Sequence, residues 1–517
     1  MVTEIIEINQ TIFDSEKPEK SYIEDLKKAA HILKDGGLVA FPTETVYGIG
    51  ANALDEVAVS KIYKAKGRPS DNPLIIHIGT LEELNLYAKY VPDYAEQLIT
   101  AFWPGPLTLI FKKQPIIPSL ITGGLETVAI RMPKNPIALK LIQLAGIPIA
   151  APSANISGKP SPTRGYHVID DLLGKVDMII DGGSSDIGLE STVLDVSHTI
   201  PVILRPGSIT KTMLEAVVDR VDMDPHLSMQ DMVPKSPGMK YKHYAPKGHL
   251  IVYSGPVNQV AEMINQEVLH MKNKGYEVGV IATSEHLKDY KCDIVLDIGS
   301  EHEPKVIAAN LFELLRTMDD LNVDYIYTRA ISDKDIGHAT MNRLLKAAGN
   351  NLIELEGVFM KIIFVCTGNT CRSPMAEGFA KYYNIKYHGN LEITSRGLMA
   401  RDGSGPSINA VKAMKMYNND ISDHQSQNLK QYDIDHDTLI LAMTKYHVDF
   451  IKQNFLVDSE QVYTLNDYIG ETADINDPFG MAQREYDACS VVIETAVKKI
   501  VKKIIKQQEV NDDSNRI

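Results

Sequence analysis

Residues 361–380 read KIIFVCTGNTCRSPMAEGFA, and their order predicts a strand, a tight loop and a helix. The apolar run at 361–365 is typical of a buried strand, and helix-forming residues follow the loop from Met375 onward. A loop in this place turns consecutive backbone N–H groups inward and adds the positive end of the helix. The stretch therefore predicts an α/β domain with an anion cradle sized for a phosphoryl group.

The side chains of this loop predict nucleophilic chemistry. The positive field of the cradle stabilises a thiolate at Cys366, which is the candidate nucleophile. Arg372 carries a planar fork that can grip two phosphoryl oxygens, and Ser373 can donate a hydrogen bond to the sulfur. A buried thiol and a surface arginine are the structural alternative, but the spacing between a strand and a helix favours chemistry.

This loop resembles the phosphate loop of the low-molecular-weight protein tyrosine phosphatases, and Pro374 and Glu377 agree with that family. The resemblance implies a doubly wound parallel sheet over residues 360–507 and phosphorylated proteins as substrates. It also implies a proton donor, an aspartate followed by proline near the C-terminus, and Asp477 fits that place. Asp474 lies close by but lacks the proline.

Two residues of this region bear on the substrate. Thr370 stands where most family members carry a bulky aliphatic residue, and Phe479 replaces the more usual tyrosine after Asp-Pro. Both resemble the bacterial protein-arginine phosphatases, so phosphoarginine is the first expectation and phosphotyrosine the alternative. Cys371 has two open interpretations, a reversible disulfide partner of Cys366 or a packed thiol.

Length and composition fit a multidomain globular protein. The chain has 517 residues, too many for one hydrophobic core, so two or three domains are expected. A net charge of −14 disfavours a generally basic nucleic-acid coat, and four cysteines do not make a disulfide framework. No apolar run is long enough for a bilayer and the N-terminus lacks a secretory pattern, so we expect a cytoplasmic protein without membrane contact.

Residues 20–210 predict a first domain of mixed α/β structure. Apolar spacing predicts a helix over 22–33, a strand follows at 38–41, and Asp55 is placed to cap a helix through Lys64. Further short apolar runs predict strands at 73–78, 128–132, 147–150, 178–180, 193–196 and 202–204.

The remaining chain divides at a segment of low periodicity. Residues 211–246 read as a linker that is rich in proline. Near its end Lys240, Lys242, His243 and Tyr244 are placed to fold over the active site of the first domain and shield it from water. Residues 247–349 alternate strands and helices in βαβ fashion and predict a second, smaller α/β domain. The third domain ends in an amphipathic helix at 498–506, and we expect disorder over 508–517.

The first domain carries polar motifs at strand ends and in loops. They are FPTETVYGIG at 41–50, KAKGRP at 64–69, WPGPLT at 103–108, TVAIRMP at 127–133 and APSANISG at 151–158. Together, lysine and arginine two residues apart and serine and asparagine two residues apart can enclose a polyphosphate by point charge, fork and neutral donors.

In this order the motifs resemble the YrdC-like threonylcarbamoyl-AMP synthases, with ESTV at 190–193 and LRPG at 204–207 completing the pattern. The linker and second domain, including GHA at 337–339 and MNRL at 341–344, resemble the longer two-domain members. The implied fold is an open twisted α/β sheet followed by a small Rossmann-like domain. The implied reaction joins L-threonine, bicarbonate and ATP, with magnesium on the phosphates, and feeds downstream tRNA-modification proteins.

The resemblance also implies which residues bind. Those expected to hold the nucleotide are Lys66, Arg68, Asn72, Ser153, Asn155, Ser161, Arg205 and Tyr244. Those expected to surround threonine are Thr45, His77, Thr127, Arg131 and Ser191. We expect catalysis mainly by positioning and charge neutralisation, with no protein-held metal. The competing interpretation is a binding module whose basic cleft contacts tRNA or other RNA without chemistry.

Overall fold

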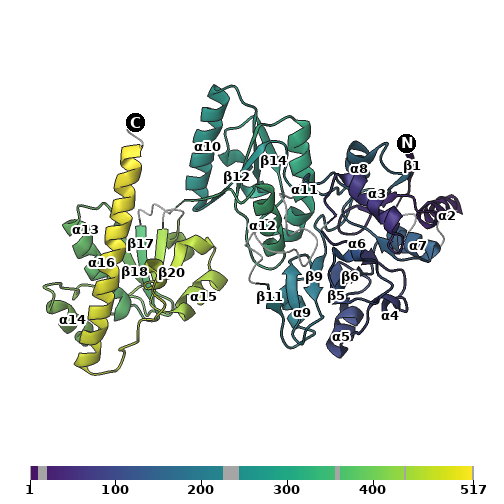
Figure 1. Ribbon diagram of the computed structural model, residues 1–517. Coiled ribbons are helices and arrows are strands. Elements are labelled where there is room, and N and C mark those ends of the chain that lie inside the picture. Colours follow the sequence, from purple (N-terminus) through teal and green to yellow (C-terminus); the bar gives the residue numbers. More distant parts are fainter. Residues whose placement is uncertain are drawn as a thin grey trace. The chain divides into compact units, whose positions relative to one another are not determined.

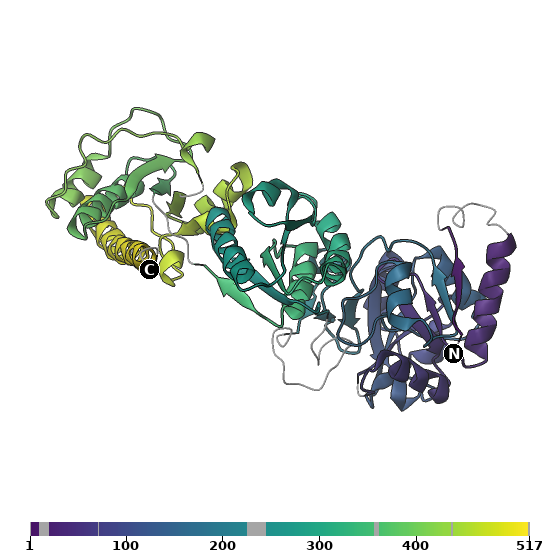
Figure 2. The same ribbon diagram turned by 90° about the horizontal axis from the view of Figure 1, so that it is seen from above.

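The computed structural model describes residues 2–9, 20–70, 72–224, 244–355, 361–435 and 438–514. The chain forms two compact units, one of residues 1–253 and 263–353 and one of residues 254–262 and 354–517 (Figures 1 and 2). The first unit holds the first predicted domain and the second except for residues 254–262, which are assigned with the third domain to the second unit. Among the described helices, none combines the length and the apolar character needed to cross a membrane.

The first domain is built on a mixed sheet of eleven strands in the order β1-β8-β2-β3-β7-β4-β6-β5-β9-β10-β11. Its strands are β1 (Glu4–Glu7), β2 (Val39–Phe41), β3 (Gly48–Asn52), β4 (Ile75–His77), β5 (Leu107–Lys112), β6 (Thr127–Arg131), β7 (Ile149–Ala150), β8 (Met178–Asp181), β9 (Thr192–Asp195), β10 (Val202–Arg205) and β11 (Asp222–Met223). Its helices are α2 (Lys20–Lys34), α3 (Glu56–Lys66), α4 (Leu84–Tyr87), α5 (Asp93–Phe102), α6 (Ser119–Thr122), α7 (Pro136–Ala145), α8 (Gly165–Leu172) and α9 (Lys211–Glu215).

The local sequence signals explain these elements. Leu26, Ala29 and Leu33 lie on the buried face of α2, which packs against α7 in one core cluster. The Asp55 side chain accepts hydrogen bonds from the first amides of α3, and the helix ends at Gly67 in the left-handed region with φ of 61°. The predicted helices and strands of this domain are confirmed.

The domain is larger at both ends than the sequence indicated. β1 pairs in parallel with β8, so residues ahead of position 20 also belong to the sheet. β11 pairs in parallel with β10, so the segment predicted as linker from residue 211 begins inside the first domain. Both strands are short and lack the strong periodicity that identifies longer strands in a sequence.

The second domain is a five-stranded sheet in the order β14-β13-β15-β12-β16. Its strands are β12 (His249–Ser254), β13 (Val278–Ala282), β14 (Ile294–Asp297), β15 (Tyr325–Arg329) and β16 (Leu352–Glu354), and its helices are α10 (Val257–Asn273), α11 (Pro304–Asp320) and α12 (Ile336–Ala347). β12, β13, β14 and β15 pair in parallel, as the βαβ alternation predicted. The core beneath α11 and α12 also takes in Val46, Leu189 and Tyr244, so the second domain packs directly on the first.

The third domain is a four-stranded, wholly parallel sheet in the order β18-β17-β19-β20. Its strands are β17 (Lys361–Cys366), β18 (Glu392–Gly397), β19 (Thr438–Ala442) and β20 (Val462–Thr464), and its helices are α13 (Arg372–Lys386), α14 (Ile408–Lys415), α15 (Lys445–Asn454) and α16 (Gln483–Ser514). One core cluster joins the sheet to α13, α14 and α16, and a second joins it to α15, so helices cover both faces. The doubly wound expectation is confirmed.

The last helix is longer than the sequence predicted. α16 runs from Gln483 to Ser514 and packs against α13, so it includes residues 508–514 of the segment expected to be disordered, whereas 515–517 lie outside the described residues (Figure 1). The correction has a physical reason, because its buried apolar residues, from Tyr486 to Ile505, anchor the helix and a polar extension then propagates at little cost.

Candidate active sites

A pocket opens where several strands of the first domain end. Its empty volume is about 680 Å³. His77 and Arg131 close the paired parallel strands β4 and β6, and Arg205 closes β10. The predicted binding residues that line it are Thr45, Arg68, His77, Arg131, Ser153, Asn155, Ser191, Arg205 and Tyr244. The fold thus gathers motifs spread over two hundred positions of the sequence into one site.

Arg131 is held rigidly in this pocket. Its Nη2 lies 2.7 Å from Glu44 Oε1, and its Nη1 donates to Thr45 Oγ1 at 2.9 Å. Its Nε donates to the carbonyl of Gly105 at 3.1 Å. Burial works against the charge of Glu44, yet the neighbouring Arg131 holds the pKa of that carboxyl below 4.5. Glu44 lies within a motif that the sequence singled out, but its role as the partner of Arg131 was missed.

Arg205 and Ser191 form a second fixed pair. Arg205 donates from Nε to the Ser191 carbonyl and from Nη2 to Ser191 Oγ, both at 3.1 Å. Ser191 Oγ also lies 2.7 Å from Thr108 Oγ1, which comes from the WPGPLT motif. Burial lowers the pKa of Arg205 to about 10, which still leaves the side chain charged near neutral pH.

His77 is a neutral group in the pocket wall. Burial, and then the charge of Arg131, lowers its pKa to about 3. Its Nδ1 has no hydrogen-bond partner within the described parts of the chain. A buried polar atom of this kind at a pocket surface fits a ligand group as its partner.

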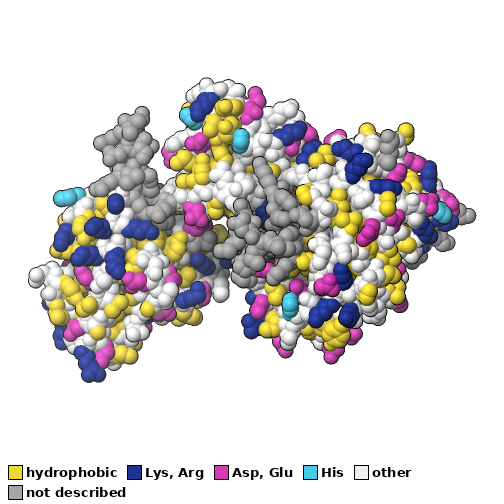
Figure 3. All heavy atoms as spheres, viewed as in Figure 1, with side chains coloured by type: hydrophobic (Ala, Val, Ile, Leu, Met, Phe, Trp, Pro, Cys, Tyr) yellow, Lys and Arg dark blue, Asp and Glu magenta, His cyan; other side chains and the backbone are white. Residues whose placement is uncertain are grey.

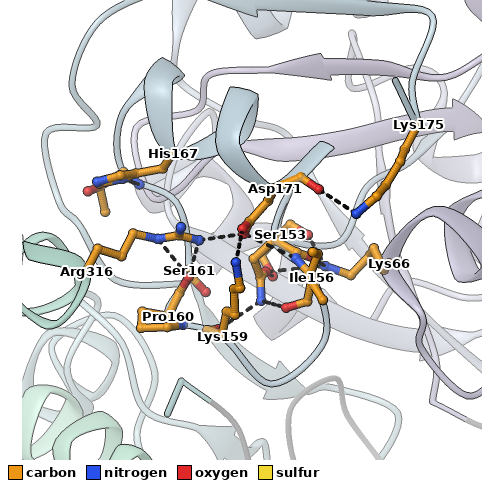
Figure 4. A network of polar contacts seen from close by, with 12 residues as sticks. Lys66, Ser153, Ile156, Lys159, Pro160, Ser161, His167, Asp171, Lys175 and Arg316 are labelled. Atoms are coloured by element: carbon orange, nitrogen blue, oxygen red, sulfur yellow. Dashed lines mark hydrogen bonds and ion pairs between the residues drawn. The ribbon is translucent and has the colours of Figure 1, made fainter. Parts of the chain in front are cut away.

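Lys66 lies behind the Ser153 loop rather than in the pocket lining (Figure 4). Its Nζ donates to the carbonyl of Ser153, to the carbonyl of Asn155 at 2.5 Å and to Asn155 Oδ1 at 3.3 Å. Ser153 Oγ in turn donates to Asn155 Oδ1 at 2.6 Å. The lysine therefore braces two pocket residues, whereas the family resemblance implied direct contact with the nucleotide.

Three other predicted residues also lie outside the lining. Thr127 begins β6 and Arg131 ends it, so the two occupy opposite ends of that strand. Ser161 is fully buried and donates to Glu190 Oε1 at 2.6 Å. Asn72 is fully buried beside the lining residue Pro73, and neither of its amide atoms finds a partner among the described residues.

Tyr244 closes the pocket from the end of the linker. It is 5% exposed, its φ of 66° is in the left-handed region, and its ring centroid lies 5.1 Å from that of Phe312 in α11. Burial raises its pKa to about 12, so its hydroxyl is protonated at physiological pH. The other linker residues singled out, Lys240, Lys242 and His243, lie outside the described residues.

The phosphate loop of the third domain has the predicted order of strand, loop and helix. Cys366 ends β17 and is 3% exposed, and α13 begins at Arg372. The sulfur lies 3.1 Å from Ser373 Oγ and accepts from the Asn369 amide at 3.3 Å. Asn369 adopts a φ of 53°, which turns its amide toward the sulfur. Two donors therefore face Cys366, one of which the sequence predicted.

A hydrogen-bond network around Asn369 holds this loop in place. Asn369 donates from Nδ2 to Ser373 Oγ at 3.0 Å and to Ser395 Oγ at 2.8 Å. Ser395 donates to Glu377 Oε2 at 2.6 Å, and His424 Nε2 lies 3.0 Å from the Asn369 carbonyl. Ser395 and His424 sit far from the motif in sequence and carry no local signal, so they were missed.

Arg372 and Asp477 meet in the site. Arg372 Nη2 lies 2.6 Å from Asp477 Oδ2, and its Nη1 donates to the Ile475 carbonyl at 3.0 Å. Asp474 instead accepts from the Lys445 amide at 2.9 Å, at the start of α15. The two aspartates that the sequence left side by side thus have different partners, and only Asp477 reaches the arginine of the loop.

The remaining loop residues are placed as follows. The Thr370 carbonyl accepts from the Ser407 amide at 2.8 Å, and Phe479 is 71% exposed. Cys371 Sγ lies 3.4 Å from both Ser407 Oγ and Tyr486 Oη, so its side chain packs toward α14 and α16. This contact agrees with the packed-thiol interpretation and does not test the disulfide.

One neighbour of the loop was not foreseen. His447 Nε2, in α15, lies 2.9 Å from Thr367 Oγ1. Its Nδ1 lies 2.8 Å from Thr444 Oγ1, the N-cap of the same helix. Burial, and then the charge of Arg372, lowers the pKa of His447 to about 4.

The two sites define an α/β protein with an arginine-lined pocket in its first unit and a strand–loop–helix site with a buried cysteine in its second. Residues 31–207 match a family model of Sua5, YciO and YrdC proteins described as telomere recombination. Residues 209–349 match the threonylcarbamoyl-AMP synthase C-terminal domain, and residues 361–510 match the low molecular weight phosphotyrosine protein phosphatase family.

Individual relatives agree with these models. The threonylcarbamoyl-AMP synthase of Pyrococcus abyssi is 50% identical over 331 residues, which cover 64% of this chain and 96% of the relative. That of Bacillus subtilis is 48% identical over 329 residues, or 63% of this chain and 94% of the relative. The crystal structure of P. abyssi Sua5 complexed with L-threonine aligns with a TM-score of 0.64 and 48% identity, over 68% of this chain and all of that one. This chain belongs to the threonylcarbamoyl-AMP synthase family and carries a low-molecular-weight phosphatase domain after it.

Proposed function

We propose that the first two domains join L-threonine, bicarbonate and ATP into L-threonylcarbamoyladenylate, and that the third domain removes phosphoryl groups from proteins. The observation that carries the first activity is the pocket itself, in which Arg68, Arg131 and Arg205 meet neutral donors. Three guanidinium groups suit a ligand that carries several anionic groups, as a triphosphate and a carboxylate do.

The geometry suggests how the two substrates divide the pocket. The carboxylate of threonine pairs best with Arg131, whose orientation Glu44 and Gly105 fix. His77 stays neutral at physiological pH, so it adds no charge beside an amine that attacks as the free base. Arg68, Ser153, Asn155 and Arg205 line the remaining pocket and would hold ATP, which enters with magnesium on its phosphates.

Catalysis in this site rests on positioning. Among the described residues, the pocket lining offers no cysteine and no carboxylate pair for acid–base work. Tyr244, held by the core under α11, would cover the reactants and limit the access of water to a labile intermediate. The rest of the linker would complete this cover. Its basic residues are the reason why the sequence predicted such a role.

The test is threonine- and bicarbonate-dependent release of pyrophosphate by the purified chain, with threonylcarbamoyladenylate identified by mass spectrometry. Arg68→Ala is expected to reduce this activity through ATP binding and to leave the phosphatase unchanged. ATP-independent RNA binding without pyrophosphate release would favour the alternative of a binding module. On the face shown in Figure 3, basic and acidic side chains are interspersed, and the described residues there form no continuous basic surface for RNA.

In the third domain the thiolate of Cys366 would attack phosphorus and form a cysteinyl-phosphate. Asp477 gives its proton to the departing atom, and as a carboxylate it then activates the water that breaks the S–P bond. Arg372 pairs with Asp477, and a phosphoryl group bound by the guanidinium fork would lie beside this carboxyl group. Ser373 donates to the sulfur as it departs.

Phosphoarginine is the preferred substrate in this proposal, and phosphotyrosine is the alternative. Thr370 and the exposed Phe479 support the first choice, because a short hydroxyl side chain in the loop leaves room beside a P–N bond. The Cys366→Ser variant separates the two sites. It is expected to abolish dephosphorylation and to leave adenylate synthesis intact, and equal loss of both activities would contradict two independent sites.

The proposed cellular role follows from the product. Threonylcarbamoyladenylate is a reactive mixed anhydride, so a downstream tRNA-modifying protein must take it up soon after release. We place this role in the cytoplasm, where ATP, bicarbonate, threonine and tRNA are all present.

A further inference from the structure

Glu190 is an unexpected residue to find in the wall of an anion pocket. It precedes β9, is 7% exposed and belongs to the pocket lining. Burial by itself raises the pKa of this carboxyl, but the charges of Arg343 and Arg205 hold it below 4.5. The group is therefore a carboxylate at neutral pH, and an uncompensated carboxylate would repel a polyphosphate.

The compensation comes from the second domain. Arg343, in α12, is fully buried, and its Nε donates to Glu190 Oε2 at 2.8 Å. Its Nη2 donates to the carbonyl of Pro206 at 2.9 Å, directly after the pocket residue Arg205. The other Glu190 oxygen accepts from Ser161 at 2.6 Å. Arg343 thus both fixes and neutralises one side of the pocket.

We infer that Arg343 is a positioning residue of the nucleotide site: it cancels the charge of Glu190, so that the first domain binds ATP tightly only when the second domain is docked. The inference rests on the proposed function, because it takes ATP as the ligand. The second domain then has a defined electrostatic role in a site for which the sequence motifs predicted none of its residues.

The chain offers a matched control for this inference. Arg316, in α11, forms another buried ion pair between the same two domains, with Nη2 2.8 Å from Asp171 Oδ2. It also donates to the carbonyl of Pro160 from Nε at 3.1 Å and from Nη2 at 2.6 Å (Figure 4). Asp171 does not belong to the pocket lining. Loss of Arg316 therefore removes a comparable domain contact without leaving a charge in the pocket wall.

The experiment compares Arg343→Met, Glu190→Gln/Arg343→Met and Arg316→Met in the full chain. Thermal unfolding and the ATP dissociation constant from titration calorimetry are measured for each. We expect Arg343→Met to weaken ATP binding roughly 10- to 100-fold, because Glu190 then loses its hydrogen-bonded ion-pair partner and draws on the charge of Arg205, which the phosphates also need. The double variant should recover to within about threefold of wild type although it stays less stable, and Arg316→Met should lose stability with an ATP constant within about threefold of wild type.

Failure of the Glu190→Gln rescue, or equal loss of ATP affinity in Arg316→Met, would overturn the inference. If Arg343→Met does not fold, the single variant Glu190→Gln decides, since it should keep or strengthen ATP binding. Tenfold weaker binding in that variant would show that the carboxylate itself holds the ligand. A wild-type chain that binds ATP but makes no adenylate would refute the proposed function alone, whereas the binding constants test the inference in either case.

Discussion

Lys66→Met separates two roles for a lysine that the sequence placed at the nucleotide. The structure buries Lys66 to 2% exposure and points its Nζ at the carbonyls of Ser153 and Asn155. Burial, and then the nearby charge of Arg68, lowers its pKa well below 10.5. Methionine keeps an unbranched apolar stem that is one atom shorter and removes the amine.

The expected loss of stability follows from these contacts. Two buried carbonyls lose their partner, at a cost of about 1–3 kcal/mol each. Removing a desolvated amine offsets part of that cost, which leaves a net destabilisation of about 2–4 kcal/mol. For a unit of this size, with an unfolding entropy of about 2.1 cal/mol/K per residue, the melting temperature should fall by roughly 3–6 °C.

The assay combines thermal unfolding with ATP titration and uses Arg68→Ala as its control. Arg68 is partly exposed and lines the pocket, so its loss should weaken ATP binding while the melting temperature changes little. Lys66→Met should show the larger thermal effect. If Lys66→Met melts like wild type and loses only ATP affinity, Lys66 contacts the nucleotide and the bracing role is wrong.

Three further outcomes are expected. Thr370→Ile should shift the ratio of kcat/KM for phosphoarginine over phosphotyrosine peptides toward phosphotyrosine by roughly 1–3 kcal/mol, and an unchanged ratio would exclude this residue as the determinant. Deleting residues 236–246 should reduce accumulation of the adenylate more than ATP binding, whereas survival of both would make the segment a tether. His447 has a folded pKa of about 4 against 6.5, so its stabilising contribution is complete above pH 6.5 and is lost as the pH falls through 4. Urea unfolding at pH 7 and 4.5 should show wild type losing about 2–3 kcal/mol more than His447→Gln, and equal losses would contradict a buried neutral imidazole.

Local patterns were sufficient for much of the fold and the loop chemistry. A strand, loop and helix around Cys366 follow from residue order, because backbone geometry creates the cradle wherever those elements meet. Asp55 and Gly67 mark the ends of α3 by capping chemistry that needs no tertiary information. The short edge strand β1 was not predicted, because its register depends on pairing with β8, far along the chain.

The sequence identified the motifs that form the candidate site, but it did not show in which direction each side chain points. Lys66 and Arg68 are two residues apart, yet one turns behind a loop and the other lines the pocket. Glu44 and Arg343 both lie in quoted motifs, but only the fold brings each to a buried partner of opposite sign. Orientation and long-range pairing depend on packing, which periodicity does not encode.

The position of β1 has a practical consequence for anyone who divides this chain. The strand ends the eleven-stranded sheet and covers one side of β8, whose backbone is otherwise unpaired along that edge. A fragment that starts at residue 20, the predicted beginning of the domain, would lose β1 and expose the edge of β8, whose side chains at 178–180 are fully buried. Such an apolar edge is a template for intermolecular strand pairing, so the fragment should precipitate, and affinity tags belong ahead of Glu4 with a spacer that lets the strand dock.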